Sequence, residues 1–155
     1  MTNNLKAFLT MISKSEGTDY GPENGYNILF GSTPSKPKYF NSYTDHPRVF
    51  TPFGKSGKKS SAAGRYQILA RIYDYYKTML KLPDFSPTSQ DKIAIQIIKE
   101  CKAMPLIEAG NLAGAIKACS HIWASFEGAG YAGQRENSID TLTEFYVSAG
   151  GNVLA

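Results

Sequence analysis

The segment from residue 17 to residue 60 constrains the fold most, because no long helix can form within it. It contains five of the chain's eight prolines, together with many glycines and eight aromatic residues. Proline lacks a backbone donor and clashes with the preceding helical turn, so it ends helices. Two short aromatic runs, 26–30 and 39–43, predict a small hairpin or irregular sheet. The stretch 54–63, which holds glycines, serines and lysines, is typical of a mobile loop and is a candidate lid.

Helical patterns flank this segment on both sides. The first helix is expected to begin at a cap on Asn3 or Asn4 and to end at Gly17, and its apolar stripe is Leu5, Phe8, Leu9 and Ile12. Later apolar residues recur at helical spacing over 68–79, 87–101, near 106, over 112–126 and from 137 onward. The expected buried face of the first of these later helices is Ile68, Ile72, Tyr75, Tyr76 and Met79. The predicted fold class is therefore α+β, mostly helical, with a small β-rich or irregular insertion after the first helix.

Length and composition indicate an ordinary globular protein. The 155 residues argue for a single domain over 1–155, with 42% hydrophobic and 19% charged residues. No apolar run approaches the roughly 20 residues of a membrane span, and no signal peptide pattern stands at the N-terminus. We therefore expect synthesis in the cytoplasm without an export signal.

Positive charge is concentrated in one part of the chain. Residues 36–71 hold eight basic side chains and one acidic side chain, Asp45, although the net charge of the whole chain is only +4. Such a local basic field favours polyanionic partners. Nucleic acid and an anionic cell envelope both fit this pattern, as does a solvated surface without a partner.

Several kinds of site are not supported by the sequence. His46 and His121 are far apart and neither has a partner at metal-ligand spacing, so no metal site is predicted. No nucleophile-elbow motif surrounds a serine. Cys101 and Cys119 form neither a metal motif nor a redox motif and are interpreted as two buried thiols in helices. A disulfide between them would need oxidising surroundings.

Glu16 is the candidate catalytic residue. A carboxyl group at the end of an apolar helix, beside an aromatic-rich segment, is expected to be partly desolvated, and desolvation raises a carboxyl pKa toward the value that a general acid needs. Position alone does not distinguish Glu16 from Asp19, Glu23 or Glu127, and an exposed glutamate at a helix end is the competing interpretation. Sugar clefts combine aromatic rings with amides, and the chain offers both in Tyr26, Asn27, Tyr66, Gln67 and Tyr131.

Four motifs together resemble the bacteriophage lambda endolysin family over nearly the whole chain. They are Ser15-Glu16-Gly17-Thr18-Asp19, Gly64-Arg65-Tyr66-Gln67-Ile68, Phe85-Ser86-Pro87-Thr88-Ser89-Gln90-Asp91, and Ile122-Trp123-Ala124-Ser125 with Gly128-Ala129-Gly130-Tyr131. The resemblance implies a lysozyme-like fold and the activity of a lytic transglycosylase. The family's catalytic glutamate, in its Ser-Glu-Gly motif, corresponds to Glu16.

The resemblance also implies roles for residues that bind the substrate. The Gly-Arg-Tyr-Gln-Ile run looks like the motif that lines the sugar cleft of goose-type lysozymes, which implies a binding role for Gln67. Tyr131 stands where many transglycosylases have a tyrosine near the catalytic acid, although Tyr131-Ala132-Gly133 departs from their Tyr-Asn-Ala-Gly form. Asn27 replaces an aspartate of the lambda protein, which argues against a required second acid there. Arg65 and the nearby lysines are expected to hold the anionic strand.

The implied reaction explains why one carboxylate suffices. The 6-hydroxyl of N-acetylmuramic acid attacks its own anomeric carbon, which cuts the β-1,4 bond to N-acetylglucosamine, leaves a 1,6-anhydro sugar and requires no cofactor. A hydrolytic muramidase remains an alternative and would need a second carboxylate, with Asp19 and Asp45 as candidates. A non-enzymatic module that binds nucleic acid or the envelope is the third possibility.

The resemblance further implies partners and a place of action. The expected partner is the glycan strand of peptidoglycan, with no nucleic acid, no stable membrane insertion and a monomeric enzyme. A holin-type protein would permeabilise the inner membrane and give the enzyme access to the periplasm, where its action on the wall causes host cell lysis.

Overall fold

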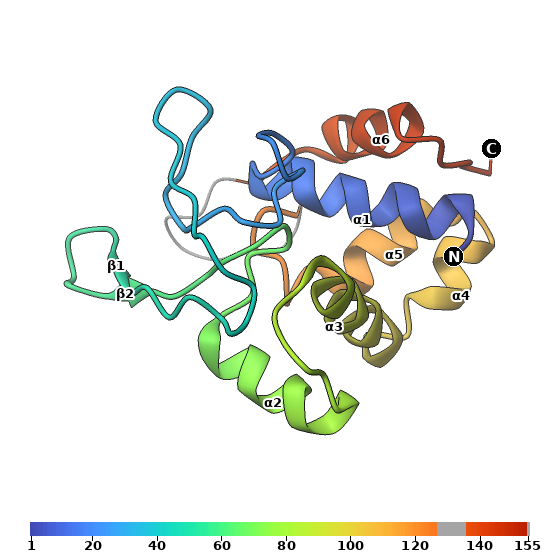
Figure 1. Ribbon diagram of the computed structural model, residues 1–155. Coiled ribbons are helices and arrows are strands. Elements are labelled where there is room, and N and C mark those ends of the chain that lie inside the picture. The colour runs from blue at the N-terminus through green and yellow to red at the C-terminus, as the bar shows by residue number, and fades with distance from the viewer. Residues whose placement is uncertain (127–135, 155) are drawn as a thin grey trace. The chain divides into compact units, whose positions relative to one another are not determined.

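The computed structural model describes residues 1–126 and 136–154, which form two compact units (Figure 1). Unit 1 combines Met1–Glu16 with Ile95–Ala155, and unit 2 is Gly17–Ala94. The mostly helical α+β fold predicted from the sequence is confirmed, with one two-stranded sheet after the first helix. The prediction of one catalytic domain over the whole chain stays a prediction. None of the helices in the described ranges is long and apolar enough to cross a membrane.

Helix α1, Asn3–Glu16, is the central element of unit 1. Its predicted apolar stripe is buried, together with Ala7, Met11 and Ser13. The helix does not use an asparagine cap as expected, because the hydroxyl of Thr2 accepts the backbone N–H of Leu5 instead. Gly17 ends the helix in a left-handed conformation, with φ of +75°, as its position predicted.

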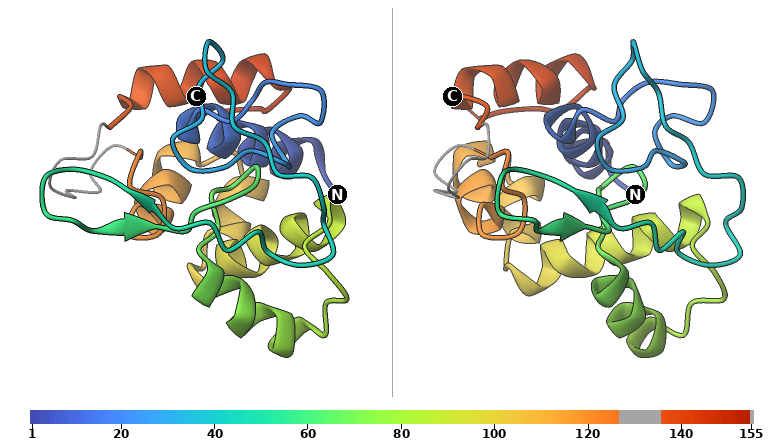
Figure 2. Two further views of the ribbon diagram at one scale, coloured as in Figure 1. Left: turned by 60° about the vertical axis from the view of Figure 1, so that its left-hand side comes forward. Right: turned by 90° about the vertical axis from the view of Figure 1, so that its left-hand side faces the viewer.

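Helix α6, Ile139–Ser148, packs along α1 in every view (Figures 1 and 2). Ser138 caps it by accepting the backbone N–H of Thr141, and Leu142 and Tyr146 are buried. Helices α4, Met104–Glu108, and α5, Leu112–Cys119, complete the described part of the unit.

The helix predicted over 112–126 is wrong in its second half, because α5 ends at Cys119. Its carbonyl accepts the backbone N–H groups of Ile122 and Trp123 at 3.0 and 3.2 Å, which turns the chain out of the helix. The following residues form turns, and Trp123 and Phe126 are nevertheless buried. Apolar spacing alone could not reveal this exit, since both aromatic residues face the core.

The β structure of unit 2 is small and irregular, as predicted. Isolated bridges join Ile28 to Tyr39 and connect Ala63 with both Leu29 and Ile68. The sheet itself lies elsewhere, where strands β1, Thr51–Pro52, and β2, Lys59–Ser60, pair antiparallel. The prediction of a loop over 54–63 is therefore wrong at its C-terminal end, because β2 and Ala63 are hydrogen-bonded. Little strand signal is present in these residues, since paired backbone rather than alternating apolar side chains defines the element.

Helix α2, Ala70–Leu80, buries a face that matches the predicted one only in part, because Tyr76 and the preceding Ile68 are buried but Tyr75 and Met79 are not. Tyr73 and Tyr76 are buried, whereas Tyr75 and Met79 are 59% and 43% exposed. Tyr73 packs against Phe85 and His46, with ring centroids 5.1 and 6.0 Å apart. Contact with the aromatic core of unit 2 therefore determines which tyrosines of α2 are buried. Helical spacing alone does not specify them.

Helix α3, Pro87–Glu100, begins as expected. The hydroxyl of Ser86 accepts the backbone N–H of Ser89 at 3.4 Å, and Pro87 occupies the first helical position, where no backbone donor is needed. Four of the apolar residues at helical spacing over 87–101 are buried, namely Ile93, Ala94, Ile97 and Ile98, whereas Cys101 lies just beyond the end of the helix and is only partly buried.

Candidate active site

Glu16 is the last residue of α1 and lies one turn beyond the buried Ile12. Because residues four apart share a helix face, burial of the α1 stripe determines the direction in which the Glu16 side chain leaves the helix. Gly17 then changes the chain direction at once. The end of α1 therefore holds a carboxyl group at a defined place in unit 1.

A hydrogen-bonded cluster of Ser15, Ser125 and Asn137 surrounds this helix end. The hydroxyls of Ser15 and Ser125 lie 2.6 Å apart. The Asn137 amide donates to the Ser15 hydroxyl at 3.1 Å, and its backbone N–H donates to the Ser125 carbonyl at 2.8 Å. The Ser125 hydroxyl also hydrogen-bonds the Glu16 side chain. This cluster, called the Glu16 cluster below, joins α1 to the segments before and after residues 127–135.

Aromatic packing next to Ser125 supports the Glu16 cluster. The ring of Phe126, which follows Ser125, meets Phe8 of α1 edge to face with centroids 6.1 Å apart. Trp123 also packs against Phe126, with ring centroids 5.9 Å apart. Such pairs stabilise by about 1 kcal/mol beyond their buried area. Ser125 is therefore held by side chains on either side of it in the chain.

Burial raises the pKa of Glu16 from 4.5 to about 7, and the Ser125 hydrogen bond opposes part of that rise. Although Glu16 remains partly exposed, the surrounding protein withdraws its carboxyl from most of the water. At neutral pH both protonation states are then populated. A carboxyl group with this pKa is suited to donate a proton and later accept one.

In unit 2, Arg65 is a buried cation that organises the loop after Gly17. Its guanidinium donates to the Asp19 carboxylate at 3.2 Å and to the backbone carbonyl of Asn24. The same group lies 5.5 Å from the centre of the Tyr26 ring. The Thr18 hydroxyl donates to the Arg65 carbonyl at 2.6 Å. With 8% of its surface exposed, Arg65 holds this loop together rather than facing solvent.

Tyr26 and Tyr66 converge on one carboxylate. Their hydroxyls donate to the same oxygen of Asp91 at 2.8 and 2.6 Å, and their rings are perpendicular. Burial and the nearby Asp91 charge raise the pKa of Tyr66 far above its usual range, and burial raises that of Tyr26. Both phenols therefore remain hydrogen-bond donors. Tyr66 is 2% exposed, whereas Tyr26 is half-buried and keeps a surface for a ligand.

Gln90 explains why the Gly64-Arg65-Tyr66-Gln67 motif begins with glycine. The fully buried Gln90 amide accepts the Arg65 backbone N–H at 3.0 Å and donates to the carbonyls of Tyr26 and Phe85. Gly64 has φ of +82°, and a Cβ there would lie 2.3 Å from the Gln90 side-chain oxygen. Only glycine fits both the backbone and this close approach.

Gln67 and Asn27 are the two predicted amide ligands, and they are placed differently. The half-buried Gln67 has φ of +53° and donates to the Gly64 carbonyl at 2.9 Å. Asn27 is 6% exposed and donates to the Glu23 carboxylate at 3.0 Å. Its side-chain oxygen is buried without a hydrogen-bond partner in the described structure. Such an acceptor is available to a donor from a bound molecule or water.

Unit 2 thus brings together five of the predicted binding residues: Tyr26, Asn27, Arg65, Tyr66 and Gln67. Tyr131 and the alternative acid Glu127 lie outside the described residues. Four supporting residues were not predicted from the sequence, namely Ser125, Asn137, Gln90 and Asp91. Three of them stand within the quoted motifs, which was the available signal, whereas Asn137 gave none beyond a place near a helix start.

The two carboxylates considered for a hydrolase are both engaged in ion pairs. Asp19 accepts from Arg65, and Asp45 accepts from Arg48 at 2.9 Å. Arg48 also binds Asp74 at 2.6 Å. Hydrogen bonding to Arg48 lowers the pKa of Asp45. Arg65 therefore binds one oxygen of Asp19, and Arg48 binds both oxygens of Asp45.

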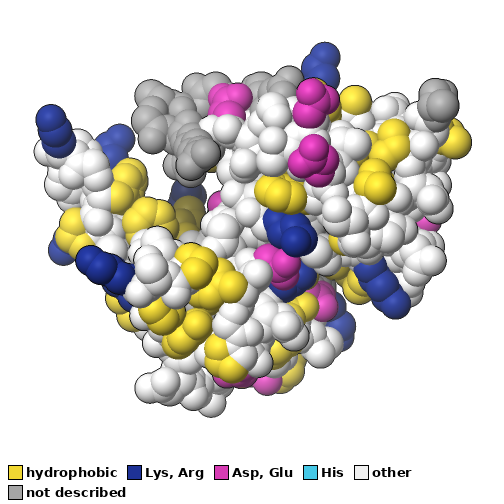
Figure 3. All heavy atoms as spheres, turned by 90° about the horizontal axis from the view of Figure 1, so that it is seen from above, with side chains coloured by type: hydrophobic (Ala, Val, Ile, Leu, Met, Phe, Trp, Pro, Cys, Tyr) yellow, Lys and Arg dark blue, Asp and Glu magenta, His cyan; other side chains and the backbone are white. Residues whose placement is uncertain are grey.

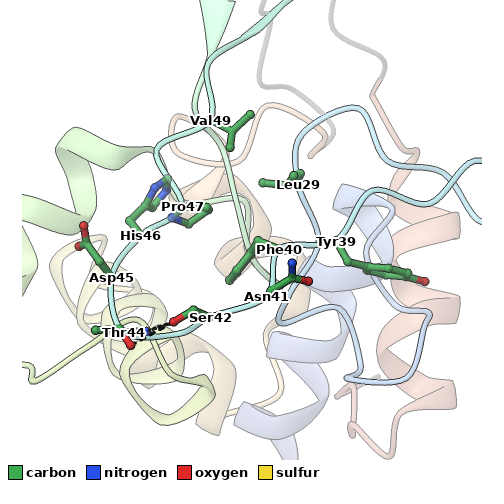
Figure 4. Close-up of a pocket in the computed structure, with 10 residues that line it drawn as sticks. All are labelled: Leu29, Tyr39, Phe40, Asn41, Ser42, Thr44, Asp45, His46, Pro47 and Val49. Atoms are coloured by element: carbon green, nitrogen blue, oxygen red, sulfur yellow. Dashed lines mark hydrogen bonds between the residues drawn. The ribbon is translucent and has the colours of Figure 1, made fainter.

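A separate hollow of about 480 Å³ opens on unit 2 (Figure 4). Residues of the 39–49 stretch line most of it, including Tyr39, Asn41 and His46. The His46 ring is buried and hydrogen-bonded through both nitrogens, so it supports the wall. None of the predicted binding residues lines this hollow. The described residues also contain no group of three His, Cys, Asp or Glu side chains placed to hold a metal ion.

Comparison with known proteins assigns the family. The model of the endolysin family matches residues 6–153. The chain belongs to the endolysin family. It is 45% identical to the endolysin of Escherichia phage P2, over 96% of this chain and 93% of that one. It is equally 45% identical to the endolysin of Escherichia phage lambda, over 99% and 95% of the two chains. Endolysins degrade peptidoglycan during host lysis, so the chain is a peptidoglycan-cleaving enzyme.

Solved structures show that the endolysin fold of this chain is lysozyme-like. Bacteriophage lambda lysozyme complexed with a chitohexasaccharide superposes with a TM-score of 0.89 at 45% identity and covers 99% of this chain and 98% of its own. A further structure of lysozyme from bacteriophage lambda gives a TM-score of 0.88 at 44% identity. The family and fold expected from the motifs are both confirmed.

Replacing Gly64 with alanine tests the role of Gln90. We expect Gly64→Ala to lower the free energy of unfolding by about 3 kcal/mol, because it combines left-handed strain with displaced Gln90 hydrogen bonds. Gly57→Ala is the matched control, since Gly57 has φ of +76° but open space around it, and should cost only about 1–2 kcal/mol. Urea unfolding measures both, and equal losses would contradict the Gln90 explanation.

The raised pKa of Glu16 predicts a pH-dependent gain in stability for Glu16→Gln. Because folding raises this pKa from 4.5 to about 7, the wild type is favoured below pH 4.5 and loses that stability as the pH rises through 7. Glutamine does not ionise. Glu16→Gln should therefore be more stable than wild type by roughly 2 kcal/mol above pH 7, a value reduced for partial exposure. The difference should fade toward pH 4.5.

Thermal unfolding followed across this pH range provides the measurement. The control is Glu144→Gln on the exposed face of α6, which should show no such gain above pH 7. A difference between wild type and Glu16→Gln that is the same at every pH would show that the Glu16 carboxyl is not desolvated by folding.

Proposed function

We propose that the chain is a lytic transglycosylase with Glu16 as its single catalytic acid and base. The observation that carries the proposal is the state of Glu16, a carboxyl at the end of α1 with a pKa of about 7 and a hydrogen bond from Ser125. The substrate is the β-1,4 bond from N-acetylmuramic acid to N-acetylglucosamine in peptidoglycan.

The reaction needs two proton movements at one carboxyl. Protonated Glu16 donates to the glycosidic oxygen while the bond from that oxygen to the anomeric carbon breaks. The resulting carboxylate accepts the proton of the sugar's own 6-hydroxyl, and the 6-oxygen bonds to the anomeric carbon. The product is a 1,6-anhydro-N-acetylmuramic acid end, and Glu16 is protonated again. An intramolecular nucleophile has a large effective concentration, so no activated water is required.

The ion pairs in unit 2 favour this reaction over hydrolysis. An inverting or retaining hydrolase needs a second carboxylate that activates water or attacks the sugar. The two candidates for that role, Asp19 and Asp45, are bound to Arg65 and Arg48. A hydrolytic muramidase remains the second candidate because the family resemblance by itself is compatible with it.

We further propose that the glycan contacts Tyr26, Asn27, Gln67 and Tyr131. The lambda lysozyme relative is complexed with a chitohexasaccharide, a chain of amide-bearing sugars. The half-buried Tyr26 offers a ring face, and the unpartnered Asn27 oxygen offers an acceptor for a sugar N–H or O–H. Arg65 and Tyr66 act through the residues they hold, since their polar groups already bind Asp19, the Asn24 carbonyl and Asp91.

The basic hairpin is proposed to hold the anionic strand. Lys55, Lys58 and Lys59 are exposed at or beside the β1–β2 turn. Figure 3 shows Lys and Arg side chains, with hydrophobic ones among them, at the edge where Figure 1 places this hairpin. Peptidoglycan stem peptides carry carboxylates, so a cluster of lysines attracts them.

For the place of action, we propose cytoplasmic synthesis of a monomer and access to the periplasm through a holin-permeabilised membrane. The enzyme itself then needs no insertion into lipid. The enzyme would reach the wall only after the membrane is permeabilised, so permeabilisation would set the moment of lysis. This is consistent with the endolysin family.

Mass spectrometry of peptidoglycan fragments tests the reaction and the residue together. Wild type should release 1,6-anhydro muropeptides, and Glu16→Gln should lower the rate by about 10³-fold, because proton transfer from the carboxyl is lost. The wild-type rate should also fall above pH 7, where Glu16 ionises. Glu144→Gln is the control with the same chemical change. Products with a reducing end would identify a hydrolase. Folded protein that cleaves no glycan would instead support a non-enzymatic binding module.

Charge reversal tests the role of the basic hairpin. Changing Lys55, Lys58 and Lys59 to glutamate should weaken binding to purified peptidoglycan about tenfold at low salt, with the difference lost at high salt because exposed charges are screened. The control carries the same change in net charge at the exposed Lys6, Lys102 and Lys117 of unit 1. Co-sedimentation with the wall measures both, and equal binding by the two variants would contradict a specific role for the hairpin.

A further inference from the structure

Two cysteines that the proposed reaction does not use lie together in unit 1. Cys101 continues the last turn of α3, where its backbone N–H donates to Ile97, and Cys119 is the final residue of α5. Neither cysteine is in a disulfide, and a side-chain hydrogen bond joins the two thiols. The His121 ring nitrogen Nε2 lies 3.9 Å from the Cys101 sulfur. A thiol pair and an imidazole are thus assembled at one place from separate segments.

We propose that Cys101 and Cys119 form a covalent modification site, which closes to a disulfide between the ends of α3 and α5 when a small disulfide such as oxidised glutathione is present. The hydrogen bond between the thiols carries this inference, because thiols within hydrogen-bonding reach of each other need little backbone movement to bond. It goes beyond the glycan-cleaving function and does not depend on it.

Exposure determines the order of the two exchange steps. Cys101 is half-buried and Cys119 is fully buried, so the oxidant meets Cys101 first. The Cys101 thiol gives its proton to His121, its sulfur attacks the disulfide, and one glutathione leaves as a thiolate that takes the proton back from His121. The Cys119 sulfur then attacks the Cys101 sulfur, the bond from Cys101 to glutathione breaks, and the second glutathione leaves with the proton that Cys119 gives up. Two thiols are oxidised by two electrons, and one oxidised glutathione becomes two reduced molecules.

The surroundings make this site slow to react but stable once closed. Burial raises the pKa of both thiols, which keeps the thiolate fraction small near neutral pH. The second step is favoured because Cys119 is already beside its target sulfur. We therefore expect the pair to remain reduced in a reducing compartment and to close in an oxidising one.

Closure would constrain the part of unit 1 that leads to the Glu16 cluster. The ring from Cys101 to Cys119 encloses α4 and α5, and such a ring stabilises a protein mainly by restricting its unfolded chain. The carbonyl of Cys119 also accepts the backbone N–H of Trp123, two residues before Ser125. Oxidised protein should accordingly melt higher than reduced protein, by about 5–10 °C for a ring of this size in a chain of this length.

The test treats the purified full chain with oxidised glutathione and follows intact mass and thiol titration after denaturation. Wild type should lose two hydrogens, keep no glutathione, stay monomeric and yield one cross-linked peptide that contains Cys101 and Cys119. Its melting temperature should rise and return after dithiothreitol. Two titratable thiols after treatment, glutathione retained on Cys101, or disulfide-linked dimers would each overturn the proposal.

Single variants check the order of steps and separate it from general stability. Cys119→Ser should stop at a stable mixed disulfide on Cys101, whereas Cys101→Ser should leave folded Cys119 unmodified. His121→Asn should slow the first step several-fold while leaving the final disulfide unchanged. Reaction of Cys119 in Cys101→Ser at the wild-type rate would contradict the assigned order, and none of these variants alters a residue of the Glu16 cluster.

Discussion

Burial of one face of α1 is the constraint on which the candidate active site depends. The stripe that includes Phe8 and Ile12 fixes the rotation of the helix, and Gly17 fixes where it ends. Glu16 therefore points in one direction without a further device. The Glu16 cluster then adds hydrogen bonds from Ser125 and Asn137 to the same helix end. Packing thus determines the position of the carboxyl, and the hydrogen bond from the cluster limits the rise of its pKa.

The same burial that prepares Glu16 for catalysis disfavours its ionised form. A carboxyl with a pKa near 7 is one that folding has partly removed from water, and this costs stability whenever the group is charged. The Ser125 hydroxyl moderates the effect by hydrogen-bonding the carboxyl. Proton transfer to and from one carboxyl at neutral pH requires a pKa near 7, which burial raises and a hydrogen bond limits. This explains why the polar Ser125 lies among Phe8, Trp123 and Phe126.

Unit 2 shows how motif residues can serve a site without touching a ligand. Arg65 and Tyr66 stand in the most recognisable motif, yet their polar atoms are bound to Asp19 and Asp91. The buried Gln90 holds the backbone of that motif and requires glycine at position 64. Among the predicted binding residues of unit 2, Tyr26 and Gln67 are only half-buried, and Asn27 has a side-chain oxygen without a hydrogen-bond partner. A motif therefore identifies a scaffold as readily as it identifies a contact.

Local spacing and motifs were enough to predict the α1 stripe, the absence of long helices over 17–60, the start of α3 near residue 87 and the family. The remaining features depend on tertiary packing. It placed β2 within an expected loop, turned the chain at Cys119, and buried Tyr73 in place of Tyr75. It also supplied the partners of Glu16 and the contact between Cys101 and Cys119. These features depend on residues distant in the chain, whose meeting no local pattern encodes.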